Sequence, residues 1–182
     1  MRGRAWSTLL VMFVGVALAA ALQELCPPLG AVRVKPPLLL GAAVYYAMRR
    51  EAVWGALAAL WCGAVENGLG PVPGGVPLLF FALAWALCFH AVRPQVEEGA
   101  RSCALAGAAL APALQLADWA ALRVSGAGAA VPLSFLAGRL LVSALAGGLA
   151  AFAAGLFLRG LDWISANVGL EEEGDAFGWT GD

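Results

Sequence analysis

Residues 54–75 read WGALAALWCGAVENGLGPVPGG, an apolar helix that ends in a carboxylate and an amide and is followed by a turn rich in glycine and proline. On a helix of about 3.6 residues per turn, small and polar residues share one face: Gly55, Ala59, Cys62 and Glu66. Bulky residues share another face: Trp54, Leu57, Trp61 and Val65. The small face suits close packing against other helices, and the bulky face suits lipid. A carboxylate at the end of an apolar span is costly, which makes Glu66 a candidate functional residue.

The composition of the whole chain extends this interpretation to the fold class. The 182 residues are 62% hydrophobic and only 13% charged, with a mean hydropathy of +0.81. A soluble domain usually carries about a quarter charged residues, so this chain has too little polar surface to coat a globule. The apolar runs are long and do not alternate, which predicts an all-α polytopic membrane protein. Basic patches interleaved with aromatic residues are absent from the sequence, which argues against a nucleic-acid partner.

The apolar runs predict about six transmembrane helices in a single domain, residues 1–170. We expect the helices at residues 5–25, 38–48, 54–70, 76–92, 103–122 and 131–158. The first run follows a short basic start, so a cleaved signal peptide is an alternative, but its length favours an uncleaved helix. Pro112 predicts a kink in the fifth helix. Residues 171–182 are acidic and contain glycine, which predicts a disordered cytoplasmic tail.

The basic residues predict the orientation of these helices. Short loops on the cytoplasmic side of a membrane carry an excess of Lys and Arg. One side of the predicted bundle carries Arg2, Arg4, Arg49, Arg50, Arg93, Arg101 and Arg159. The other side carries Arg33, Lys35 and Arg123. We therefore expect both termini in the cytoplasm.

Three ionisable residues fall inside predicted helices and toward the outer side: Glu66, Asp118 and Arg139. Arg139 and Asp118 each lie roughly 10 Å from the outer end of their helix, at about 1.5 Å per residue. Two amides extend this predicted outer polar cluster, because Asn67 follows Glu66 and Gln115 shares a face with Asp118. Unpaired charges at that depth are costly, so we expect Arg139 to pair with Asp118, Glu66 or both. The cluster is either a pocket for a ligand or partner, or an internal ion pair that fixes helix register.

The sequence contains no catalytic pattern. The motifs HExxH, GxSxG and the P-loop are all missing. An intramembrane aspartyl hydrolase needs two facing aspartates, but Asp118 and Asp162 fall on opposite sides of the predicted membrane. His90 stands at a helix end without partners nearby in sequence, and the four cysteines lack metal-ligand spacing. We expect neither enzymatic activity nor a cofactor or metal site.

Residues 38–83 read LLLGAAVYYAMRREAVWGALAALWCGAVENGLGPVPGGVPLLFFAL. A short apolar helix with an aromatic end is followed by a double-basic turn, a helix ending in an acidic residue, a Gly/Pro turn and another apolar helix. This order resembles the rod shape-determining protein MreD family, as do the chain length and the predicted topology. The sequence departs from the family at Glu66, where Asp is usual, in the number of prolines in the turn, and in its acidic tail.

The resemblance implies a non-enzymatic scaffold of the cell-elongation machinery in the bacterial inner membrane. It implies an MreC-like single-span partner, with MreB, RodA and a penicillin-binding protein as neighbours besides membrane lipid. It also implies a fold similar to the S component of energy-coupling-factor transporters. The alternative is therefore a substrate-binding membrane subunit of a vitamin transporter of that type, in which the polar cluster would line the solute site.

Overall fold

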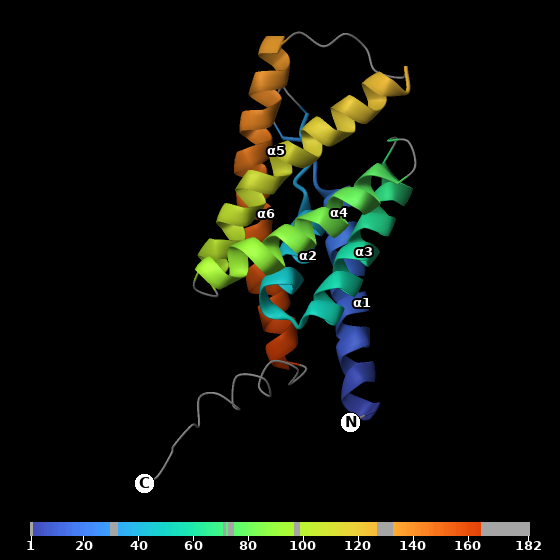
Figure 1. The fold of residues 1–182 in the computed structure, drawn as a ribbon, viewed down its shortest axis with the longest axis vertical. Coiled ribbons are helices and arrows are strands. Elements are labelled where there is room, and N and C mark those ends of the chain that lie inside the picture. The colour runs from blue at the N-terminus through green and yellow to red at the C-terminus, as the bar shows by residue number, and fades with distance from the viewer. Residues whose placement is uncertain are drawn as a thin grey trace.

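The computed structural model of the chain is an all-α membrane protein with six α-helices in its described part (Figure 1). The structure describes residues 2–29, 33–70, 72, 75–96, 99–126 and 133–164, with the side chains of residues 2–5, 7, 133 and 164 left out. The predicted tail at residues 171–182 lies outside the described residues. Apart from an isolated antiparallel bridge between Leu29 and Val34, the described backbone is helical or forms connections.

The helices lie close to the predicted ranges, and each predicted helix is present. Their bounds are α1 Arg2–Leu25, α2 Leu38–Arg49, α3 Ala52–Leu69, α4 Val76–Leu87, α5 Ala100–Val124 and α6 Leu133–Ile164. A π-helical turn, η1 Cys88–Val92, and a 3-10 turn, η2 Arg93–Gln95, continue α4. The prediction that the sixth helix ends near Leu158 is wrong, since α6 continues past Arg159 for another turn. The apolar residues after Arg159 keep that last turn packed against the bundle, because Leu161 contacts the core.

Four helical segments in the described part are long and apolar enough to cross a membrane: Thr8–Leu25, Val76–Gln95, Ala100–Val124 and Ser134–Trp163. The helix α2 has 12 residues and is about 18 Å long, well below the roughly 30 Å of a bilayer core. Instead of facing lipid, α2 is enclosed by protein: every residue from Leu39 to Met48 is buried. The helices α1, α3, α5 and α6 all contact it. A short helix is tolerated at membrane depth when protein surrounds it in this way.

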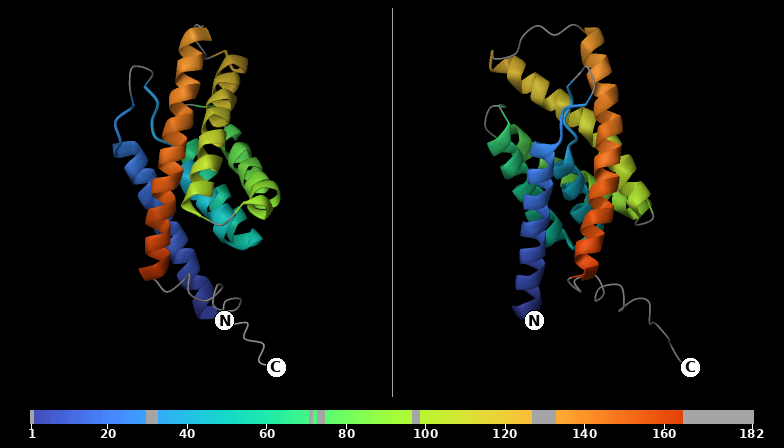
Figure 2. Two further views of the ribbon diagram at one scale, coloured as in Figure 1. Left: turned by 90° about the vertical axis from the view of Figure 1, so that its left-hand side faces the viewer. Right: turned by 180° about the vertical axis from the view of Figure 1, so that it is seen from behind.

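Small residues let the helices approach one another closely. The helices α5 and α6 pack side by side, with Gly107 and Gly147 facing each other (Figure 2). A Cβ atom added at Gly147 would lie 2.6 Å from the carbonyl oxygen of Gly107 and would also meet the Cβ of Ala111. A Cβ atom at Gly41 of α2 would lie 2.9 Å from the carbonyl oxygen of Ala150 in α6. These contacts are the close packing that small residues allow between membrane helices.

The two predicted faces of α3 are confirmed in part, because Trp54 and Val65, which were expected on the bulky face toward lipid, are half-buried and pack against the core. Gly55, Ala59 and Cys62 are buried in the bundle. Leu57 and Trp61 are exposed on the other face. We refer below to the proximal end of the bundle, where α1 begins and α6 ends, and to the distal end, where α1 ends and α6 begins (Figure 1).

Candidate functional site

The predicted polar cluster lies at the distal end of the bundle. Glu66 and Asn67 occupy the last turn of α3, Gln115 and Asp118 lie in the distal half of α5, and Arg139 lies near the start of α6. All five side chains are half-buried. The structure therefore brings three helices with polar residues to one end of the bundle. Glu66 and Asn67 make hydrogen bonds within the bundle. Gln115, Asp118 and Arg139 make none to other described residues.

Glu66 is held by a glutamine that the sequence analysis did not single out. The carboxamide Nε2 of Gln23 donates a hydrogen bond of 2.7 Å to Oε2 of Glu66. The Oε1 of the same buried Gln23 accepts a 3.0 Å hydrogen bond from the backbone N–H of Leu39. That N–H is in the first turn of α2, where backbone donors have no partner within the helix. Gln23 thus connects Glu66 to the N-terminus of α2, whose positive dipole end favours a nearby carboxylate.

Asn67 has a local structural role. Its Oδ1 accepts a 2.9 Å hydrogen bond from the backbone N–H of Gly75. Gly75 has a φ of 96°, a left-handed conformation that glycine adopts without steric cost, and it directly precedes α4. Asn67 therefore links the last turn of α3 to the residue that precedes α4. Gln115, by contrast, makes no hydrogen bond to any other residue that the structure describes.

Asp118 and Arg139 approach each other without direct contact. Asp118 interacts electrostatically with both Glu66 and Arg139, yet no hydrogen bond or ion pair joins any two of these three side chains among the described residues. Three buried polar atoms here have no hydrogen-bond partner in the described part of the chain: Oδ1 of Asp118, Nε1 of Trp119 and Nε of Arg139. The expected pairing of Arg139 is therefore present at longer range only. Figure 1 shows α5 and α6 diverging toward this end of the bundle.

A second polar network, which the sequence analysis missed, lies at the proximal end. Asp162 of α6 accepts a 2.7 Å bond from Nη2 of Arg50 and a 2.8 Å bond from the hydroxyl of Tyr45. The side chains of Arg50 and Asp162 are only 6% and 1% exposed. Nη1 of Arg93 donates a 2.8 Å bond to the carbonyl oxygen of Arg50. This proximal network therefore joins the end of α2, the end of α6 and the turn after α4.

The sequence placed Asp162 on the opposite side from Asp118, and the structure agrees. The burial of Asp162 does not follow from the predicted helix, because that helix ends at Leu158, before Arg159 and Asp162. The pairing with Arg50 joins residues 112 positions apart, a separation that helical periodicity cannot reveal. The apolar character of residues 160–164 was the available signal, since a helix that stays apolar beyond a charge can stay packed.

His90 lies in the π-helical turn among aromatic and basic side chains. Its ring meets Trp85 edge-on with ring centres 6.1 Å apart and meets Phe89 at 5.1 Å. The guanidinium of Arg93 lies 5.4 Å from the ring centre of Phe89. No three His, Cys, Asp or Glu side chains among the described residues are placed to hold a metal ion. The described side chains around His90 thus give it packing partners.

Comparison with known proteins gives no relative: no family model, curated protein or solved structure matches the chain.

Proposed function

We propose that the chain is a non-enzymatic scaffold in the bacterial inner membrane, with both termini in the cytoplasm, that binds an MreC-like single-span partner. The observation that carries the proposal is the set of buried polar atoms on Asp118, Trp119 and Arg139 that have no hydrogen-bond partner among the described residues. A buried polar group without a hydrogen bond costs about 1–3 kcal/mol, so a docked segment that supplies partners would gain that energy. The resemblance of residues 38–83 to the MreD family supplies the class of partner.

The distribution of hydrogen-bond partners at the distal end supports a docking site on α5 and α6. Glu66 and Asn67 are already occupied by Gln23 and Gly75 within the bundle. Asp118, Trp119 and Arg139 keep buried polar atoms without partners in the described chain. Because no direct bond joins Asp118 and Arg139 among the described residues, a partner could supply a donor to Asp118 and an acceptor to Arg139. MreB, RodA and a penicillin-binding protein would be neighbours in the same assembly.

A substrate-binding subunit of an energy-coupling-factor-type vitamin transporter is the second candidate function. The observation that favours it is the same separation of Asp118 from Arg139, since a zwitterionic solute could bridge the two charges. In that case Gln115 would contribute a neutral donor and acceptor to the solute site. The two functions predict different molecules that co-purify with the protein.

The test is affinity purification from native membrane in mild detergent, followed by mass spectrometry of proteins and small molecules. We expect a stoichiometric single-span protein with the wild-type chain and its loss, by about tenfold or more, with the double variant Asp118→Asn/Arg139→Gln. The matched control is Arg101→Gln, which removes an exposed arginine at the opposite end of α5. Recovery of ATPase subunits with a small molecule would favour the transporter subunit, and recovery of neither would contradict both functions.

A further inference from the structure

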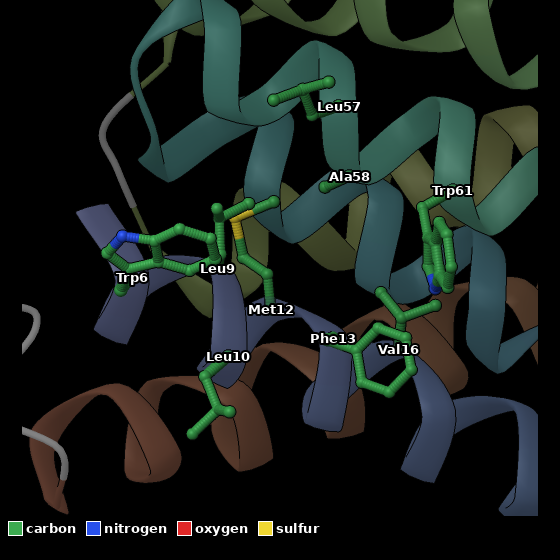
Figure 3. Close-up of a pocket in the computed structure, with 9 residues that line it drawn as sticks. All are labelled: Trp6, Leu9, Leu10, Met12, Phe13, Val16, Leu57, Ala58 and Trp61. Atoms are coloured by element: carbon green, nitrogen blue, oxygen red, sulfur yellow. The ribbon is translucent and has the colours of Figure 1, made fainter.

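Two surface regions of the bundle differ in the partners that their side chains need. The groove between α1 and α3, with Phe13 and Trp61 in its wall, is lined by apolar and aromatic side chains (Figure 3). None of its lining residues has a buried polar atom without a partner. At the distal ends of α5 and α6, by contrast, Asp118 and Arg139 each keep such an atom without a hydrogen-bond partner in the described part of the chain. The packing of α5 on α6 indicates how these two atoms can be satisfied.

The facing sides of α5 and α6 change from small to polar residues toward the distal end. On α5, four residues at spacings of four, four and three share one face: Gly107, Ala111, Gln115 and Asp118. On α6, three residues at spacings of four share one face: Arg139, Ser143 and Gly147. Gly147 lies against Gly107 and Ala111, so these two faces meet. The polar residues therefore continue the glycine seam toward the distal end.

The glycine contacts also set the register of the two helices, which run antiparallel (Figure 2). Asp118 lies seven residues after Ala111 on α5, and Arg139 lies eight residues before Gly147 on α6. At about 1.5 Å per residue, these separations are about 10 Å and about 12 Å in the same direction along the bundle. A seam that continued past Ala111 would thus place Asp118 and Arg139 at the same level on facing surfaces.

Pro112 directly follows the contact at Ala111 and lies inside α5. It has no N–H to donate to the carbonyl oxygen of Ala108, so one backbone hydrogen bond fewer resists bending at this point of the helix. The helices α5 and α6 diverge toward the distal end (Figure 1). We name residues 113–124, the part of α5 beyond the proline, the distal arm. The distal arm carries Gln115 and Asp118.

We infer that the distal arm moves about Pro112 between the open arrangement described here and a closed one, in which it follows α6 and a direct ion pair joins Asp118 to Arg139. The closed arrangement gives Oδ1 of Asp118 and Nε of Arg139 partners within the chain, whereas both atoms have none among the described residues in the open one. Opposite charges attract strongly in surroundings of low dielectric constant, which favours closure.

The two arrangements regulate access to the docking site. A docked segment needs the same atoms of Asp118 and Arg139, so the closed arrangement excludes it and the open arrangement admits it. This regulatory role rests on the proposed function. The motion itself is a property of the isolated chain and is measured without any partner.

The test is double electron–electron resonance between two spin labels on the purified full-length chain in lipid nanodiscs. Val124 on the distal arm and Leu141 on α6, both exposed, are replaced by a ketone-bearing amino acid that carries the label. We expect two distance populations about 6 Å apart, since a change of about 20° at a proline kink moves the end of an arm of about 18 Å by that amount. Labels at Leu105 and Leu156, exposed on the proximal parts of the same helices, should give one population.

Variants separate the ion pair from the bend. Asp118→Asn removes the attraction to Arg139 and should reduce the shorter-distance population by about tenfold. The matched control is Glu24→Gln, which makes the same chemical change in an exposed carboxylate that pairs with Lys35 on α1 and the loop after it. It should leave both populations unchanged. Pro112→Ala restores the missing backbone donor and should leave one population.

A single distance between the labels at positions 124 and 141 in the wild-type chain would overturn the inference. Two populations that Asp118→Asn leaves unchanged would overturn it as well, because the ion pair would then not drive closure. Two populations that depend on Asp118, in a chain that recovers no single-span protein from the membrane, would uphold the motion and contradict the docking role. The failure of the motion and the failure of the proposed function are thus distinguished.

Discussion

Single residues decide two different kinds of polar site in this membrane protein. At the proximal end, Asp162 is fully enclosed and receives bonds from both Arg50 and Tyr45. At the distal end, Asp118 and Arg139 lie within electrostatic range but without a direct bond. The first arrangement is complete within the chain. The second leaves polar atoms without a partner in the part of the chain that the structure describes, and this difference separates a stabilising ion pair from a candidate binding site.

Removal of Arg50 should therefore be costly. In Arg50→Ala the carboxylate of Asp162 stays buried without its cationic partner, and breaking a buried pair from one side typically costs about 3–5 kcal/mol. We expect a clearly lower melting temperature in detergent, measured by the fluorescence of a thiol-reactive dye that reacts with the buried cysteines as the protein unfolds. The control is Arg159→Ala, an exposed arginine on the same helix as Asp162. Equal melting temperatures for the two variants would show that the buried pair contributes nothing to stability.

At the scale of elements, the sequence predicts the existence and order of the helices better than their depth in the bundle. The apolar runs gave all six helices, because continuous hydrophobicity is a strong signal. Residue size predicted the buried face of α3 but only half of the exposed face, since Trp54 and Val65 pack against the core. The central position of α2 could not be read in the same way, since a buried short helix and a lipid-facing one are both apolar throughout. Likewise, Gln23 lies 43 residues from Glu66, so their bond was not predictable from local spacing.

The seam between α5 and α6 depends on glycine. A Cβ at Gly147 would meet the Cβ of Ala111 and the backbone of Gly107. Because the obstacle includes backbone, we expect Gly147→Ala to destabilise the protein by about 1–3 kcal/mol through overpacking. Gly68→Ala is the matched control, since nothing lies within 4 Å of a Cβ at that position of α3. Thermal unfolding of both variants in the same detergent measures the difference, and a neutral Gly147→Ala would disprove close packing at the seam.

At the scale of the whole molecule, the charge distribution gives the two ends different characters. The proximal end carries most of the arginines, and the distal end carries few basic residues. This bias favours a cytoplasmic proximal end. In the proposed orientation, the buried ion pair lies toward the cytoplasm, and Asp118 and Arg139 lie toward the outer side. The sequence predicts this division through Glu66, Asp118 and Arg139, whereas the burial of Asp162 is indicated only by the apolar residues around it.

Cysteine labelling tests that orientation. Cys26 follows the distal end of α1 and is partly exposed, whereas Cys62, Cys88 and Cys103 are buried. A membrane-impermeant maleimide is added to cells whose outer membrane is permeable and whose inner membrane is intact. We expect it to modify Cys26 and to leave the three buried thiols unmodified. The variant Cys26→Ser should remove all labelling and serves as the control. Labelling of Cys26 only after cell lysis would place the distal end in the cytoplasm and reverse the topology.

The most direct test of the central claim is site-specific photo-cross-linking in native membranes. A photoreactive phenylalanine analogue replaces Gln115, which lies beside Asp118 on α5 and makes no hydrogen bond to another described residue. The same analogue at Leu141, exposed on α6, provides the control. The scaffold account predicts a single-span membrane protein cross-linked from position 115 and absent from position 141. Cross-links from position 115 to lipid alone, or the same protein from both positions, would contradict a docking site between the distal ends of α5 and α6.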